Sequence, residues 1–194
     1  MRRSEARVTA LRCALGLVAG VLTAAAAHAA ADPQLCFACH GPNGNSQNPA
    51  VPSLAAQPAQ FIGAQLVMFR EKRRTDPQMS PIAATLTNAD MSALGKFFST
   101  QQREAPAKKP AEDVMASGKA LAEKFNCVVC HGPALKGQQH IPRLAGQQAD
   151  YLRTQLRGFK AGTRFDMDGN MTSAAQPLGD PDIDVLAQYL SALQ

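Results

Sequence analysis

The chain has 194 residues, of which 45% are hydrophobic and 18% are charged, and its formal net charge is +5. Four arginines and one glutamate lie before residue 30, so the rest of the chain holds 16 positive and 14 negative residues, a balance of +2. This balance disfavours a nucleic-acid-binding protein, whose basic surface would persist in the folded domain.

The first 29 residues are typical of a cleaved export signal. A basic start with Arg2 and Arg3 precedes an uncharged apolar stretch over residues 14–27, and Ala27-His28-Ala29 fits a small-x-small cleavage site. The apolar stretch is short for a membrane span. We therefore predict a signal peptide over residues 1–29, with a retained anchor as the alternative.

The first half of the mature chain carries a Cys-x-x-Cys-His motif at residues 36–40, followed by two predicted helices. Pro58 can open a helix whose apolar residues keep a helical spacing as far as Phe69, and Thr87 offers capping chemistry for a second helix. The basic run at residues 70–74 is predicted to be a solvated helix end.

The second half follows residues 104–111, a proline-rich and charged segment that indicates an extended linker. Amphipathic helices are predicted over residues 112–126 and 147–161, on either side of a second Cys-x-x-Cys-His motif at 127–131. The last helix should begin with Asp180 as its N-cap and a proline next. No alternating run suggests a strand, so the predicted fold class is all-α.

The two halves are an internal repeat with a period of about 90 residues. Pro-Ser-Leu-Ala-Ala-Gln at 52–57 matches Pro-Arg-Leu-Ala-Gly-Gln at 142–147. The register continues through the pairs Phe61 and Tyr151, Gln65 and Gln155, Phe69 and Phe159, Met79 and Met171, Leu86 and Leu178, Asp90 and Asp182, Leu94 and Leu186, and Phe97 and Tyr189. The repeat predicts two related domains, residues 30–103 and 112–194.

Each Cys-x-x-Cys-His motif has the spacing that attaches c-type haem. Two thiols on one helical turn can each form a thioether with a haem vinyl group, and the next histidine then lies under the iron. A zinc ribbon would bring its cysteine pairs within roughly 20 residues, and a redox dithiol belongs in a fold with strands. We predict two covalently attached haem c groups, with thioether anchors Cys36, Cys39, Cys127 and Cys130 and iron ligands His40 and His131.

The sixth iron ligand decides between a closed electron carrier and an open, reactive site. Methionine usually fills a core, but Met79 and Met171 follow their histidines at almost the same distance in the two halves. We predict that these two ligate iron. Met167 is the competitor of Met171, whereas Met68, Met91 and Met115 are predicted to be core residues.

Two loop features bear on the axial histidines. The backbone carbonyl of Pro52 or Pro142 can accept the Nδ1 proton of the nearby histidine and fix its tautomer, the alternative being that each proline only stiffens its loop. His140 has no partner in the first half, so it is predicted to be a solvent-facing loop residue.

Together these motifs resemble the dihaem cytochrome c4 family over essentially the whole mature chain. The resemblance implies two tandem cytochrome c-like helical domains related by a pseudo-twofold axis, a periplasmic location, His/Met ligation of both irons and electron flow towards a terminal oxidase. Similar dihaem chains also serve as subunits of flavin-containing sulfide dehydrogenases.

One departure from the family pattern concerns the helix that precedes each haem motif. Residues 112–126 supply it in the second half, where Gly118 allows a close helix crossing, but the first half has only residues 30–35 there. The first haem is therefore expected to be less well packed, or covered by a partner protein.

The leading hypothesis is a one-electron carrier, not an enzyme, that docks with a membrane oxidase or reductase and binds no nucleic acid or small-molecule substrate. A second hypothesis is a fixed electron-transfer subunit of a periplasmic dehydrogenase. A third is a haem peroxidase or ligand sensor with one open iron, which the two aligned methionines disfavour.

Overall fold

The computed structural model of the chain describes residues 31–105 and 110–194. Within these ranges the regular structure is helical, apart from one isolated β-bridge between Gln138 and Ile141. The all-α prediction is confirmed. The predicted signal peptide, residues 1–29, and the middle of the predicted linker, residues 106–109, lie outside the described residues.

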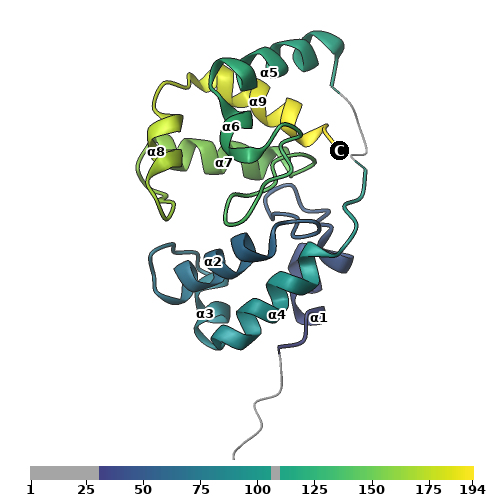
Figure 1. Cartoon of the computed structure of the whole chain (residues 1–194), viewed down its shortest axis with the longest axis vertical. Coiled ribbons are helices and arrows are strands. Elements are labelled where there is room, and N and C mark those ends of the chain that lie inside the picture. Colours follow the sequence, from purple (N-terminus) through teal and green to yellow (C-terminus); the bar gives the residue numbers. More distant parts are fainter. Residues whose placement is uncertain (1–30, 106–109) are drawn as a thin grey trace, which may run out of the picture.

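The helices form two groups that follow the repeat. The first half holds α1 (Gln34–His40), the 3-10 turn η1 (Pro42–Gly44), α2 (Ala59–Arg70), α3 (Met79–Ala84) and α4 (Asn88–Ser99). The second half holds α5 (Glu112–Lys124), α6 (Cys127–His131), α7 (Ala149–Lys160), α8 (Asn170–Ala175) and α9 (Asp180–Ser191). The two groups lie at opposite ends of the long axis, and the loops after α1 and α6 face each other between them (Figure 1).

The core of the first half lies where α2 packs against α4. A Cβ atom added at Gly95 of α4 would lie 2.5 Å from the carbonyl oxygen of Ala59, so the absence of a side chain lets the two helices approach closely. The buried apolar side chains of this core are Ile62, Leu66, Met91, Leu94 and Phe98. Each half thus has its own small core, which is typical of domains that need a cofactor for stability.

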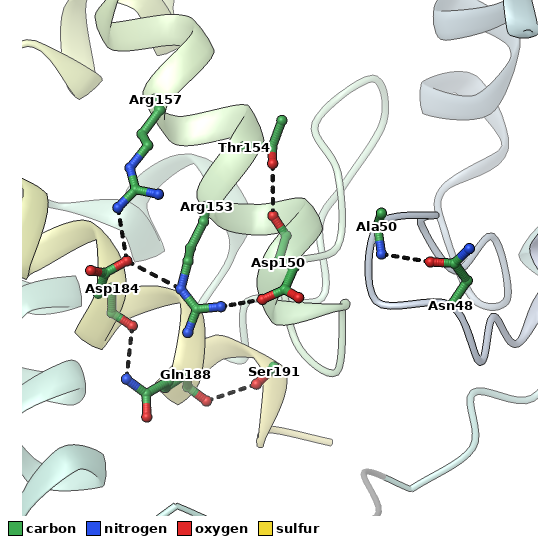
Figure 2. A network of polar contacts seen from close by, with 9 residues as sticks. All are labelled: Asn48, Ala50, Asp150, Arg153, Thr154, Arg157, Asp184, Gln188 and Ser191. Carbon is green, nitrogen blue, oxygen red and sulfur yellow. Dashed lines mark hydrogen bonds and ion pairs between the residues drawn. The ribbon is translucent and has the colours of Figure 1, made fainter.

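The second half is built around α9, which packs against both α5 and α7. Gly118 of α5 lies against Tyr189 of α9, where an added Cβ atom would be 2.2 Å from the tyrosine Cβ. On the other side, Arg153 and Arg157 of α7 each lie 3.1 Å from the carboxylate of Asp184 on α9 (Figure 2). These ion pairs are partly exposed, so packing contributes more to the stability of this half than they do.

The described part of the first half has no helix that crosses α4 as α5 crosses α9. The chain reaches α4 through Ala31, whose N–H donates to Asp90 at 2.9 Å, and α1 begins three residues later. Phe97, the counterpart of Tyr189, packs instead on Phe37 with ring centroids 6.1 Å apart. An aromatic contact from the haem motif itself therefore takes the place of the crossing helix.

The structure confirms the predicted start of α4 and corrects that of α9. Thr87 caps α4 as expected, because its hydroxyl accepts the N–H of Asp90 while the Asp90 carboxylate accepts the N–H of Thr87. The N-cap of α9 is Gly179 and not Asp180, so that prediction is wrong by one residue. The physical reason is Asp182, whose carboxylate accepts the Gly179 N–H at 3.0 Å and so places the helix start one residue earlier.

Two glutamines join the halves through reciprocal hydrogen bonds. Gln57 accepts the N–H of Arg143 at 3.0 Å and donates to the Arg143 carbonyl at 2.9 Å. Gln147 accepts the N–H of Ser53 at 2.8 Å and donates to the Ser53 carbonyl at 2.8 Å. All four residues are buried. The two halves are therefore related by a local pseudo-twofold arrangement at their contact.

Replacing Gly118 with alanine should destabilise the second half by about 1 to 3 kcal/mol, because the new methyl group would force α5 away from α9. Denaturant unfolding of the holoprotein measures this change. Gly63→Ala in α2 is the matched control, since its nearest neighbour would be 3.9 Å away and alanine favours a helix by about 0.5 to 1 kcal/mol. Equal destabilisation by both variants would contradict the assigned packing.

Amide hydrogen exchange should be faster over residues 36–40 than over residues 127–131. The reason is that α6 is preceded by the packed helix α5, whereas no helix precedes α1 among the described residues. Exchange measured by mass spectrometry or NMR on the holoprotein checks this. Equal protection of the two motifs would show that the missing crossing does not loosen the first half.

Candidate haem sites

Both Cys-x-x-Cys-His motifs lie on short helices, α1 and α6, that end at glycines with positive φ angles. Gly41 has φ 77°, and a Cβ atom there would lie 2.0 Å from the Asn45 carbonyl oxygen. The next turn can therefore follow the histidine directly. Cysteines three residues apart on a helix lie on one face, so each motif can present two thiols and a histidine to the same neighbouring group.

The two motif histidines have matching environments. The Nδ1 atom of His40 lies 2.8 Å from the Pro52 carbonyl oxygen, and that of His131 lies 2.8 Å from the Pro142 carbonyl oxygen. Because a carbonyl can only accept, Nδ1 must carry the proton in both rings, which leaves the Nε2 lone pair available to a metal. Burial lowers the pKa of both histidines, which favours the neutral, ligating form.

These hydrogen bonds bear on the role of the repeated prolines. Each proline carbonyl accepts a proton from a histidine that is only 7% (His40) or 4% (His131) exposed. The prolines therefore do more than stiffen their loops, and the predicted tautomer-fixing contact is present in both halves.

The four motif cysteines are free thiols and form no disulfide. Cys39 and Cys130 are exposed, whereas burial raises the pKa of Cys36 and Cys127. Among residues 31–105 and 110–194, no three histidine, cysteine or acidic side chains gather as a zinc site would require. This donor set suits a cofactor that is bonded through sulfur and ligated by one histidine.

Apolar side chains in or next to the motifs, and one on α3, are unusually exposed. Leu35 precedes the first cysteine and is 79% exposed, Val129 lies between the second pair and is 70% exposed, and Ile82 on α3 is 51% exposed. Such surfaces favour contact with an apolar group. The thiols, the free Nε2 atoms and these side chains together fit a covalently bound haem c in each half.

Met79 and Met171 occupy equivalent places in the first turns of α3 and α8. Both side chains are partly buried and pack against the core of their own half. The Met79 N–H donates to Asp76 at 2.8 Å, and the Met171 N–H donates to Asp166 at 3.0 Å. The aspartates thus hold the backbone of the two predicted iron ligands.

Met167 differs from Met171 in its surroundings. Its side chain is 49% exposed and takes no part in the core contacts of the second half. His140 lies nearby with 41% of its side chain exposed, and its Nε2 atom is 3.0 Å from Asp168. It is therefore a loop histidine as predicted, but it has a carboxylate partner. These positions favour Met171 over Met167 as the inward-facing thioether.

A polar cluster that the motifs do not reveal lies between the halves. Arg74 donates to the Tyr151 hydroxyl at 3.0 Å and to Gln155 at 3.2 Å, and Arg164 also donates to Gln155. Burial lowers the pKa of Arg164 to about 10. Burial raises the pKa of Tyr151, but the charges of Arg74 and Arg164 outweigh it and lower that pKa overall.

The position of Arg74 corrects the prediction that residues 70–74 are a solvated helix end. Lys72 and Arg73 are exposed as predicted, but Arg74 turns into the contact between the halves and lies 4.5 Å above the Phe69 ring. The chain turns back after α2 because Lys72 adopts a left-handed conformation with φ 57°. The repeat could have indicated a structural role for Arg74, because an arginine, Arg164, stands at the aligned position of the second half. Arg164 lies over the Phe159 ring as Arg74 lies over the Phe69 ring.

Comparison with known proteins adds independent findings. The family model of cytochrome c matches residues 24–105 and again residues 115–194. The chain is 37% identical to cytochrome c4 of Thiocapsa roseopersicina over 87% of this chain and 96% of that protein. It is 35% identical to the thiosulfate dehydrogenase electron acceptor of Thiomonas intermedia, over 87% of this chain and 84% of that protein.

A solved structure is also similar. Reduced cytochrome c4 from Pseudomonas stutzeri superposes with a TM-score of 0.76 and 27% identity, over 82% of this chain and 94% of that chain. Among the described residues, no helix is both long and apolar enough to cross a membrane. The tandem match and the relatives agree with the two equivalent sites, so the chain is an electron-transfer protein that binds two haem c groups and belongs to the dihaem cytochrome c4 family of cytochromes c.

Proposed function

We propose that the chain is a periplasmic one-electron relay in which each half holds one iron between a histidine and a methionine. The observation that carries this proposal is the pair of buried histidines, each with Nδ1 bonded to a proline carbonyl and Nε2 free. The proposed thioether anchors are Cys36, Cys39, Cys127 and Cys130, and the proposed iron ligands are His40, Met79, His131 and Met171.

When bound, haem supplies an iron that alternates between ferric and ferrous states. The chain's own residues tune and protect that centre. The proline carbonyls orient the histidine rings, and the aspartates before Met79 and Met171 hold the methionine backbones. With a histidine and a methionine holding the iron in each half, neither half would leave a place for a substrate at the metal, and the bound haem would serve electron exchange with docked partners.

We propose that electrons leave towards a terminal oxidase. The predicted first domain, residues 30–103, has six positive and four negative residues, a net +2. The predicted second domain, residues 112–194, has eight positive and nine negative residues, a net −1. Charges of opposite sign favour different partners at the two ends through small, transient contacts.

The predicted signal peptide supports a periplasmic location.

A second candidate is a fixed electron-accepting subunit of a periplasmic dehydrogenase. Two observations favour it: α4 lacks the crossing helix in the described part of the first half, and one relative is named a thiosulfate dehydrogenase electron acceptor. A partner that covers the first half would supply the missing contacts.

Replacing Met171 with leucine should remove the methionine-to-ferric-iron charge-transfer band of one haem, and so about half of the total intensity. Met79→Leu should remove the other half. The visible and near-infrared spectrum of the oxidised, purified holoprotein measures both changes. Carbon monoxide should then bind to the reduced variants at the opened iron but not to the wild-type protein.

Met167→Leu is the matched control, because Met167 lies in the same loop and is 49% exposed. Its spectrum should match that of the wild type. If the charge-transfer band kept its full intensity in Met171→Leu and lost half of it in Met167→Leu, Met167 and not Met171 would be the iron ligand. Loss of all colour from the denatured, acid-acetone-extracted protein would contradict covalent haem and overturn the proposed function.

Size and partner measurements distinguish a relay from a fixed subunit. A relay should leave periplasmic extract as a single chain whose reduction rate by its donor falls with rising ionic strength, because salt screens the docking charges. Co-elution with a flavoprotein through high salt would instead support the dehydrogenase subunit. Size-exclusion chromatography and stopped-flow reduction give the two results.

A further inference from the structure

The peptide unit between Pro52 and Ser53 takes part in two hydrogen bonds of different origin. Its carbonyl oxygen, on Pro52, accepts the Nδ1 proton of His40 at 2.8 Å. Its N–H group, on Ser53, donates to the Oε1 atom of Gln147 at 2.8 Å. His40 belongs to the first half and Gln147 to the second. One peptide group therefore lies between a histidine of one half and a glutamine of the other.

The same arrangement occurs in the opposite direction. The Pro142 carbonyl accepts the Nδ1 proton of His131 at 2.8 Å, and the N–H of the same peptide unit, on Arg143, donates to Gln57 at 3.0 Å. Each half thus supplies the outer acceptor for the histidine of the other half.

The glutamine bonds of both connections are buried, and the histidine bonds to Pro52 and Pro142 are partly buried. The exposed fractions are 7% for His40, 1% for Ser53 and 5% for Gln147. In the second connection, His131 is 4%, Arg143 is 8% and Gln57 is 4% exposed. Hydrogen bonds in such surroundings polarise one another more strongly than they do in water.

We propose that Gln147 and Gln57 are crossed positioning residues, each of which tunes the iron-binding histidine of the opposite half through a shared peptide group. The proposal rests on the proposed function, because it takes His40 and His131 as iron ligands. An acceptor on the peptide N–H moves electron density towards the carbonyl oxygen, which then binds the histidine proton more strongly. A histidine held in this way is a more basic ligand and stabilises ferric iron.

Removing the acceptor should therefore favour the reduced state of the opposite haem. Gln147→Leu should raise the midpoint potential of the first-half haem and leave the second-half haem unchanged. Gln57→Leu should do the reverse. Losing a strengthening of about 10 to 30% from a hydrogen bond of ordinary net strength should raise the ratio of ferrous to ferric iron at a fixed potential by up to about twofold.

The experiment is a spectrally monitored redox titration of the full-length holoprotein, with each potential assigned to its haem by NMR of the axial methionine methyl groups. The ring Nδ1 proton of His40 gives a second readout in the reduced protein. Its NMR signal should move towards that of a weaker hydrogen bond in Gln147→Leu, while the signal of His131 should stay in place.

Gln148→Leu is the matched control. The Gln148 side chain also crosses between the halves, where it donates to the Ser46 carbonyl, but it does not contact either proline peptide. Its backbone N–H, which donates to Gln147 Oε1 at 2.9 Å, is kept in the variant. A role limited to holding the halves together would make Gln148→Leu and Gln147→Leu shift the potentials alike.

Gln147→Glu tests whether an oxygen acceptor at this position is what matters. It also provides the test if the leucine variant does not assemble. Glutamate offers an oxygen acceptor to the Ser53 N–H in either protonation state, so the His40 ring-proton signal should return towards its wild-type position. A His40 signal that moves equally in the leucine and glutamate variants, or a shift confined to the haem of the substituted half, would overturn the proposal.

These outcomes are separate from a failure of the proposed function. Wild-type protein without a methionine-to-iron charge-transfer band would remove the ligand assignment itself. A normal band in every variant, combined with potentials that do not respond in the crossed pattern, would leave the relay intact and remove only the tuning role of the glutamines.

Discussion

A single backbone hydrogen bond, from the Nδ1 proton of a buried histidine to a proline carbonyl, organises each half of this protein. It sets the tautomer of the ring, leaves Nε2 for a metal and ties the haem motif to the loop that meets the other half. If Nε2 were the protonated nitrogen, neither His40 nor His131 could ligate iron through that atom, whatever the cysteines bind. Binding of a metal cofactor by these histidines therefore depends on the geometry of this hydrogen bond.

The contact between the halves is polar and buried, which is costly unless every group finds a partner. The glutamine pairs satisfy the backbone on both sides, while Arg74 and Arg164 enclose the Tyr151 hydroxyl and the amide of Gln155. The repeat breaks here, since Tyr151 faces this cluster where the first half has Phe61. The Tyr151 hydroxyl in this arginine cluster therefore has no counterpart at the aligned position of the first half.

Much of this structure could be predicted from the sequence because haem attachment is local. The spacing within residues 36–40 and 127–131 specifies thiols and a histidine on one turn, and the repeat separates Met79 and Met171 from the core methionines. The contact between the halves depends on how two domains dock, which no local pattern encodes. The sequence therefore predicts a solvent-exposed Arg74, and no motif points to Asp76 or Asp166, although both precede the methionines.

The two sites share their inner geometry and differ in what surrounds it. Near the second motif, α5 crosses α9 at Gly118, so a helix of the same half packs beside this site. Around the first, Phe37 of the motif packs on Phe97 and Phe98, so the residues that position the thiols also form part of the core. Cys127 and Val128 of α6 likewise pack against the core of the second half, which has the helix α5 beside it in addition. If both irons take the proposed histidine and methionine ligands, the unequal supports of the two sites are a physical reason for the irons to differ in potential. A difference in potential would give electron transfer through the chain a direction.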